Sequence, residues 1–226
     1  MDTYNQFFNK YNKALVALSG GADSAYALIL AVQHMGCENI VAATCVNNHI
    51  FNYEIENARK ICEFLGVKHI EFITEVTPEF LKNDDQRCYH CKKTIMSQMQ
   101  TISDHEVIFD GTNIDDDASD RPGSKAISEL KIISPLKELG IGKELILSKV
   151  AHLPVVFHDD SCKATRLTHT IDDERMSLVE KLEDQLRDKF SGVRYRIDDK
   201  QLAFNKPIRL YKKDFEYINK IKHQNE

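Results

Sequence analysis

The sequence has no apolar run long enough to cross a lipid bilayer, and its first segment, MDTYNQFFNKYNK, has no apolar core of the kind that a signal peptide needs. It also lacks a surplus of positive charge: its formal net charge is −5, which gives no general reason for binding to nucleic acid or to acidic membranes. No internal repeat or low-complexity tract is present. These absences lead us to expect a globular protein of the cytoplasm.

Strand and helix patterns alternate in the first part of the 226-residue chain. Apolar runs at 13–18, 40–46 and 68–73 predict strands, and apolar residues at helical spacing in 23–35 and 53–65 predict the helices between them. Such an alternation is typical of a parallel sheet with right-handed crossovers. We therefore predict an α/β fold with a doubly wound, Rossmann-like parallel sheet, in which ligands bind at the carboxyl ends of the strands.

The rest of the chain contains shorter elements. Helical patterns occur at 88–99, at 142–151, in a charged stretch that ends at 189 and at 212–222, and strand patterns occur at 107–109, at 132–134 and twice within 192–204. Residues 74–86 and 114–126 read as loops. We predict that residues 1–167 form the main domain and that residues 168–226 form a small α+β unit for substrate binding or oligomerisation.

A glycine turn, Ser19-Gly20-Gly21-Ala22-Asp23-Ser24, joins the first predicted strand to the first predicted helix. Adjacent glycines allow a tight turn whose N–H groups point at an anion, and the helix start adds free N–H groups and a positive dipole end. The turn lacks the lysine of the GxxxxGK(S/T) phosphate loop. It resembles the PP-loop, SGGxDS, of ATP pyrophosphatases, which split ATP into AMP and pyrophosphate while adenylating a substrate. A plain helix-capping turn is the alternative.

The six cysteines are not expected to form a disulfide framework, because the compartment is reducing. Those that lie in apolar patterns are expected to be buried thiols, namely Cys37, Cys45 and Cys62. Cys88 and Cys91 form a C-x-x-C pair, and Cys162 follows 71 residues later. Three thiolates suit a [4Fe-4S] cluster with one open iron, but a zinc ion with a fourth ligand such as His90, or free redox thiols, fit the same pattern. Basic neighbours are expected to lower the pKa of these thiols.

Several stretches occur together in one order: ALSGGADS (17–24), FLKNDDQRCYHCKK (80–93), DGTNIDDDASDRPGSKA (110–126), SPLKELG (134–140), SCKATR (161–166) and GVRYR (192–196). With them the chain resembles the LarE family of ATP-dependent sulfur transferases, in the PP-loop superfamily. The resemblance covers most of residues 14–200. It departs from the family at 167–170, where Leu-Thr-His-Thr stands in place of the usual Pro-Tyr-Gly, and at the end of the chain, which lacks a final glycine-rich strand.

The resemblance implies a specific reaction. LarE enzymes adenylate a carboxylate of pyridinium-3,5-biscarboxylate mononucleotide and replace the activated oxygen with sulfur, in the synthesis of the nickel-pincer nucleotide cofactor of lactate racemase. One subgroup takes the sulfur from its own cysteine, which here would be Cys162. Another holds a [4Fe-4S] cluster with three cysteines, and Cys88, Cys91 and Cys162 place this chain in it. The implied cofactors are ATP, Mg²⁺ and the cluster, and the implied partners are a sulfide or other sulfur donor and further copies of the chain.

The resemblance also implies roles for single residues. It assigns ATP binding to Ser19, Gly20, Gly21, Asp23, Ser24, Asp110 and Asn113, catalysis to Cys162, Asp23 and Lys92, and substrate binding to Arg121, Thr165, Arg166, Arg194 and Arg196. Lys92 also reads as a solvated lysine, and Asp110 and Asn113 as turn formers. Arg194 and Arg196 share one face of a predicted strand because they are two residues apart, which suits phosphate binding or a merely exposed face.

Rival functions remain open at this point. PP-loop tRNA thiolases also use three cysteines and a cluster, although the acidic balance and short chain count against RNA binding. An ammonia-using amidating synthetase would leave Cys88, Cys91 and Cys162 without a role. A non-catalytic nucleotide- or metal-binding module would release no pyrophosphate from ATP.

Overall fold

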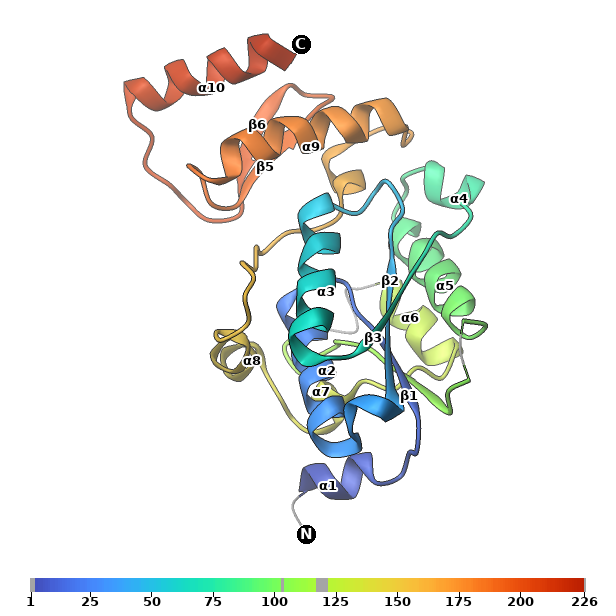
Figure 1. The fold of residues 1–226 in the computed structure, drawn as a ribbon. Helices are drawn as coiled ribbons and strands as arrows, with labels where there is room; N and C mark the ends of the chain where they lie inside the picture. Colours follow the sequence, from blue (N-terminus) through green and yellow to red (C-terminus); the bar gives the residue numbers. More distant parts are fainter. Residues whose placement is uncertain (1–2, 103, 117–121, 226) are drawn as a thin grey trace.

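A four-stranded parallel sheet forms the centre of the molecule (Figure 1), in a computed structural model that describes residues 3–102, 104–116 and 122–225. Its strands are β1 (Ala14–Ala17), β2 (Ile40–Cys45), β3 (Lys68–Phe72) and β4 (Val107–Phe109), in the order β3-β2-β1-β4. All the strand pairs are parallel. The predicted α/β fold with a parallel sheet is confirmed.

Helices cover both faces of this sheet, as Figure 1 shows. On one face lie α1 (Thr3–Phe8), α2 (Ala22–Met35), α3 (Asn52–Leu65), α7 (Pro135–Glu138) and α8 (Lys143–Val150); on the other lie α5 (Arg87–Met99) and α6 (Pro122–Glu129). Val16 packs against the first group and Leu15 against the second, and both are fully buried. Neighbouring strand residues point to opposite faces, so an unbroken apolar strand is the expected sequence for this two-sided core.

The loop prediction for 74–86 is wrong in part, because this stretch contains the short helix α4 (Pro78–Leu81). The Thr77 side chain accepts a hydrogen bond from the Phe80 N–H (3.3 Å), and proline is favoured at the first helical position that follows such a cap. Within the charged stretch 114–126, Pro122 likewise begins helix α6. A side-chain cap at Thr77 precedes α4, and a proline occupies the first position of α6, so neither helix start is marked by an apolar pattern.

The expected strand at 132–134 is reduced to a single parallel bridge between Ile133 and Phe109. Two backbone hydrogen bonds form it: the Ile133 N–H donates to the Ile108 carbonyl, and the Asp110 N–H donates to the Ile133 carbonyl (both 3.0 Å). The chain then turns into α7 at Pro135, which has no N–H with which to extend a ladder. This bridge still brings the residues after β4 to the carboxyl edge of the sheet.

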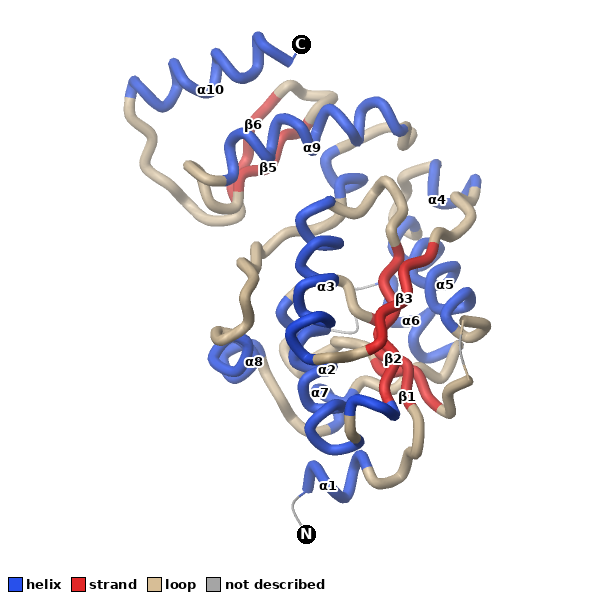
Figure 2. Tube along the Cα trace, viewed as in Figure 1, coloured by secondary structure: helices blue, strands red, loops and turns tan. Residues whose placement is uncertain are grey.

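The C-terminal part of the chain lies beyond the carboxyl ends of the strands, as Figures 1 and 2 show. It consists of α9 (Asp173–Arg187), an antiparallel pair of β5 (Val193–Arg196) and β6 (Gln201–Phe204), and α10 (Lys212–Asn225). It has an apolar cluster of its own, which includes Leu186, Tyr195 and Ile218. The remaining elements are two short 3₁₀ helices, Cys37–Asn39 and Lys163–Arg166. The described helices are all too short or too polar to span a membrane.

Candidate functional site

A cavity of about 430 Å³ opens at the carboxyl edge of the sheet. The turn after β1, the end of β2, helix α5, the residues after β4 and the turn at Cys162 all contribute to its walls. Parallel sheets bind their ligands at this edge, and the volume lies in the range of small-molecule sites. Four of the segments that carried the family resemblance, 17–24, 80–93, 110–126 and 161–166, therefore contribute residues to one cavity.

The predicted PP-loop forms the floor of this cavity. Ser24 Oγ accepts from the Ser19 N–H (3.1 Å), donates to the Gly21 carbonyl (3.1 Å) and lies 3.0 Å from Ser19 Oγ. Gly20 has a φ of +85°, and a Cβ atom there would overlap the Glu54 carbonyl oxygen and lie 2.6 Å from its carbon. Only glycine fits this position, so the turn and helix α3 are pressed together around it.

Asp23 lines the cavity and forms an ion pair that the sequence motif does not show. Lys143 Nζ lies 2.9 Å from both carboxylate oxygens of Asp23. Lys143 is the first residue of α8, and its N–H donates to Asp115 Oδ2 (2.6 Å). The fold thus brings a distant cation to a phosphate loop that has no lysine of its own. No local pattern marks Lys143, because its role depends on where α8 packs.

Asp110 and Lys92 lie together on another wall of the cavity, with Nζ 3.5 Å from Oδ2. The buried Asp110 carboxylate also accepts from the Thr112 N–H (3.2 Å), the Thr112 hydroxyl (2.6 Å) and the Ser134 hydroxyl (2.7 Å). Asp110 is therefore largely occupied in shaping the loop after β4. Lys92 stays half exposed and keeps donor capacity for an anion.

Asn113 is buried, but it shapes the loop and is not among the residues that line the described cavity. Its Oδ1 accepts from the Asp115 N–H (2.9 Å), and its own N–H donates to Asp116 Oδ2 (3.1 Å). Asp116 does line the cavity. Arg121 lies outside the described residues. An acidic side chain from this loop thus lines the cavity.

The predicted thiols, Cys88, Cys91 and Cys162, all line the cavity, and Cys45 joins them from the end of β2. Burial raises the pKa of the Cys91 and Cys162 thiols, and for Cys91 the neighbouring cysteines raise it further. For Cys91 and Cys162, the expectation that basic neighbours lower the pKa is wrong, because burial outweighs the opposing effect of Arg87. Arg87 donates to Cys88 Sγ (3.7 Å), and its buried Nε has no hydrogen-bond partner among the described residues.

Of the other cysteines, two are buried as predicted and one is not. Cys45 and Cys62 are buried as expected, but Cys37 is exposed because it begins the short 3₁₀ helix after α2. None of the described cysteines forms a disulfide. Within the described residues, no three His, Cys, Asp or Glu side chains are grouped to hold one metal ion. This finding concerns a single metal ion. The ligands of an iron–sulfur cluster lie farther apart, since each thiolate binds a different iron.

Thr165 and Arg166 hold the turn at Cys162 and are not among the residues that line the described cavity. The Thr165 hydroxyl donates to the Cys162 carbonyl (2.8 Å). Arg166, only 1% exposed, donates through Nε and Nη2 to Glu183 (2.8 and 2.9 Å) and through Nη2 to Asp160 (2.7 Å). Its remaining nitrogen, Nη1, donates to the Ser161 carbonyl and hydroxyl and to the Thr165 hydroxyl (2.9–3.1 Å), so the structure gives it no free donor for a substrate phosphate.

Arg194 and Arg196 lie on one strand, β5, away from the described cavity walls. Arg196 is exposed. Arg194 is half-buried; its Nη2 donates to the Asp159 carbonyl (3.4 Å), and its buried Nε has no hydrogen-bond partner among the described residues. The structure therefore leaves donor capacity at both side chains but does not bring them to the PP-loop.

The sequence of this chain is similar to those of several known proteins. Residues 13–105 match the model of the queuosine biosynthesis protein QueC. An uncharacterized protein of Synechocystis is 32% identical over 148 residues, which cover 63% of this chain and 55% of that protein. An uncharacterized protein of Methanocaldococcus jannaschii is 33% identical over 201 residues, which cover 86% of this chain and 77% of that protein.

A relative with a named activity is also similar. The pyridinium-3,5-bisthiocarboxylic acid mononucleotide synthase of Lactiplantibacillus plantarum is 28% identical over 135 residues, which cover 56% of this chain and 48% of that protein. The chain thus spans about half the length of this relative and of the Synechocystis protein. With the parallel sheet and the SGGADS turn at its carboxyl edge, these matches show that the chain belongs to the LarE family of the PP-loop superfamily.

Proposed function

We propose that the protein is an ATP-dependent sulfur transferase that adenylates a carboxylate and then replaces the activated oxygen with sulfur. The proposal is carried by one observation: the PP-loop and the three predicted thiols line the same cavity. Adenylation needs the PP-loop, and sulfur transfer needs the thiols. The relative from L. plantarum, named as a synthase of a bisthiocarboxylic acid mononucleotide, supports pyridinium-3,5-biscarboxylate mononucleotide as the acceptor in nickel-pincer nucleotide synthesis.

The first half-reaction needs positive charge around the phosphates of ATP. A carboxylate oxygen of the acceptor attacks the α-phosphorus, the bond to the β-phosphate breaks, and pyrophosphate leaves. The SGGADS turn and the start of α2 line the cavity and would supply N–H groups to the leaving pyrophosphate, and Lys92 and Lys143 are the nearby cations. Asp23 and Asp116 are carboxylates of the kind that hold Mg²⁺ together with substrate phosphates.

The second half-reaction forms a carbon–sulfur bond while the bond from the carboxyl carbon to the AMP oxygen breaks. Hydrogen sulfide and the acyl adenylate give the thiocarboxylate, AMP and protons. The chain's part is to hold both reactants at reacting distance in one cavity. Arg87, whose buried Nε has no described partner, is placed to offset negative charge beside the thiols.

The donor set fits the proposed cluster. Cys88, Cys91 and Cys162 are free thiols that line one cavity, and three protein thiolates leave one iron of a [4Fe-4S] cluster open. The bound cluster would supply that iron as a binding position for sulfide. His49 contacts one of these thiols: it is buried, and its Nε2 lies 3.3 Å from Cys91 Sγ. The alternative is that Cys162 itself gives up its sulfur once.

The deciding test uses protein purified without oxygen, beside the Cys162→Ala variant. Four irons and matching acid-labile sulfide per chain, lost in the variant, together with repeated thiocarboxylate formation by mass spectrometry, support the proposal. No iron, with Cys162 converted to dehydroalanine after one turnover, supports the single-use alternative. Thiolated tRNA in place of the thiocarboxylate nucleotide would overturn the acceptor. Asp23→Ala should stop pyrophosphate release, and unchanged release would remove the adenylation step.

The remaining assignments stay predictions. We propose a main domain at 1–167 and a C-terminal unit at 168–226, a homo-oligomer, and a cytoplasmic location. The apolar cluster around Leu186 and Phe190 supports a separate C-terminal unit, whereas the cluster of Phe51 with Ile171 joins the two parts.

A further inference from the structure

His49 is a buried histidine beside the thiols, in the segment that follows β2. It is only 5% exposed, and its Nε2 lies 3.3 Å from Cys91 Sγ. The residue lies outside all the stretches that carried the family resemblance, and its side chain has no task in the proposed reaction. Its contact with one of the three thiols therefore needs a separate explanation.

The two asparagines that precede His49 anchor its backbone. Asn47 Nδ2 donates to Thr74 Oγ1 (2.9 Å), and Asn47 Oδ1 accepts from the Thr74 N–H (2.9 Å), so the segment is tied to the residues after β3. Asn48 Nδ2 donates to Asp173 Oδ1 (2.9 Å) at the start of α9. These two anchors come from different parts of the chain, and together they fix the place from which the His49 ring projects.

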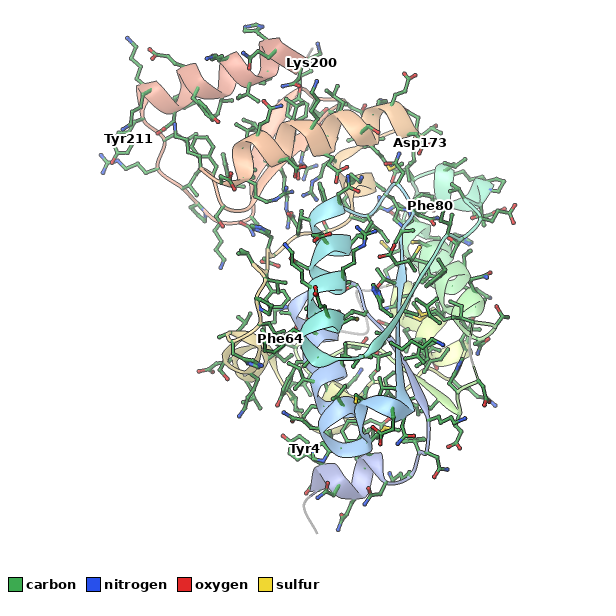
Figure 3. All side chains as sticks on the ribbon, in the orientation of Figure 1. Tyr4, Phe64, Phe80, Asp173, Lys200 and Tyr211 are labelled. Carbon is green, nitrogen blue, oxygen red and sulfur yellow. The ribbon has the colours of Figure 1, made fainter. Side chains whose placement is uncertain are left out.

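The His49 ring packs against Phe80, with ring centroids 4.8 Å apart. Phe80, labelled in Figure 3, belongs to helix α4 and is itself buried. An apolar ring at position 49 would fill the same space, so packing alone does not require a histidine. What histidine adds is a ring nitrogen that can form a hydrogen bond with the Cys91 sulfur.

The backbone of His49 is also bonded to the turn that carries the third thiol. The His49 carbonyl accepts from the Lys163 N–H (2.9 Å), and Lys163 directly follows Cys162. The Thr165 N–H donates in turn to the Cys162 carbonyl (3.0 Å). His49 thus contacts Cys91 through its side chain and the Cys162 turn through its backbone, so it constrains how these two cysteines lie relative to each other.

A histidine nitrogen can serve a cysteine in both of its forms. In one neutral tautomer Nε2 accepts from the S–H of a free thiol, and in the other tautomer Nε2–H donates to a thiolate. Hydrogen bonds to ligand sulfurs are among the features that set the reduction potential of an iron–sulfur cluster. An N–H donor stabilises the additional negative charge of the reduced cluster, so it raises the potential.

We propose that His49 is a positioning residue of the thiol site, whose Nε2 forms a hydrogen bond with the Cys91 sulfur. It accepts from the free thiol, and it donates to the thiolate when Cys91 holds iron. The iron-bound form of this contact rests on the proposed function, whereas the contact with the free thiol does not. No covalent bond forms or breaks at His49.

The contact with the free thiol is tested by NMR of the full-length, iron-free protein with isotopically labelled histidine rings. The His49 signals are those that are missing in His49→Phe. Cys91→Ala should shift the His49 Nε2 signal, whereas the control Cys88→Ala, which removes another thiol of the same cavity, should leave the signal in place. Equal shifts in the two variants, or no shift in Cys91→Ala, would overturn the proposal.

A matched pair of variants tests the iron-bound form. His49→Phe keeps a ring beside Phe80 but has no donor, whereas the amide of His49→Gln offers an N–H in place of Nε2. Both variants keep the backbone carbonyl that binds Lys163 and all three thiols, so both should bind as much iron as the unmodified protein.

The reduction potential of the bound cluster, measured by titration followed by electron paramagnetic resonance, then reports on the hydrogen bond. His49→Phe should shift this potential to a more negative value, and His49→Gln should restore most of the difference. An unchanged potential in His49→Phe, or the same shift in both variants, would overturn the proposal. A side chain that only filled space would not distinguish phenylalanine from glutamine in this direction.

The two measurements separate the role of His49 from the proposed function. If the unmodified protein takes up no iron, the proposed cluster fails, and the NMR comparison still decides whether His49 holds Cys91. If iron binds but neither the potential nor the His49 signal depends on the pair, the cluster stands and the role of His49 is overturned.

Discussion

Replacing Gly20 with alanine should remove ATP binding and destabilise the fold, because a side chain at this position meets two separate obstacles. The φ of +85° costs an L-residue on the order of 1 kcal/mol. The added Cβ would also overlap the Glu54 carbonyl oxygen and lie 2.6 Å from its carbon. Both atoms belong to the backbone of helix α3, so no side-chain rotation relieves the contact. Overpacking of this kind typically costs roughly a further 1–3 kcal/mol.

Gly140 provides the control, since it has a φ of +70° but no atom within 4 Å of the place that a Cβ would occupy. For a chain of this length, about 1 kcal/mol shifts the Tm by roughly 2–4 °C. Gly140→Ala should therefore lower the Tm by about that much and leave ATP–pyrophosphate exchange intact. Gly20→Ala should lower it by at least about twice as much and abolish exchange. Equal Tm shifts in the two variants would refute the argument that the PP-loop is wedged against α3.

Three further predictions concern charged groups. Arg166→Ala should lower the free energy of unfolding in urea by roughly 3–5 kcal/mol, because it leaves buried carboxylates unpaired. Arg196 is exposed, so Arg196→Ala should change this free energy by about 0.5 kcal/mol or less. Similar losses in the two variants would contradict the buried pairing. Burial raises the pKa of Glu54 from 4.5 to about 7, so the folded state binds the proton more tightly and stability should fall as pH rises between these values. The free energy of unfolding should fall by at most about 3 kcal/mol over this range, and the fall should be absent in Glu54→Gln. The same dependence of stability on pH in Glu54→Gln as in the unmodified protein would contradict this prediction. Lys143→Ala should raise the KM for ATP in pyrophosphate exchange about tenfold with a smaller change in kcat, unlike Lys149→Ala on the same helix.

The parallel sheet and the position of the PP-loop could be predicted because their signals are local. The apolar run before Ser19 and the helical spacing after it specify a strand, a turn and a helix without reference to the rest of the chain. Helices α4 and α6 could not be predicted from the sequence, because both are short and begin inside polar sequence. Helix α4 begins after the cap Thr77, and α6 begins at Pro122. Their apolar faces are too brief to show a helical period.

The cavity contains residues that no local pattern marks. Cys45 reads as an ordinary core residue of β2, yet the end of that strand turns its thiol into the cavity beside Cys91. Lys143 reaches Asp23 across 120 positions of sequence. In the opposite direction, Arg166 has the sequence surroundings of a phosphate ligand but is enclosed by carboxylates, one of them from α9. Burial and pairing of charges depend on tertiary packing, so they are visible only in the fold.

The buried charges also explain why the C-terminal unit matters to a site that it does not line. Lys163 and Arg166, which follow Cys162 in the same turn, are each only 1% exposed. Their partners are Glu180 (2.9 Å) and Glu183 (2.8 Å), one turn apart on α9. A buried cation without its partner is strongly unfavourable, so the Cys162 turn keeps its place only while α9 is docked. The position of the third thiol is therefore set by the C-terminal unit, and a change in how α9 packs would move Cys162 relative to Cys88 and Cys91 without altering any residue of the cavity.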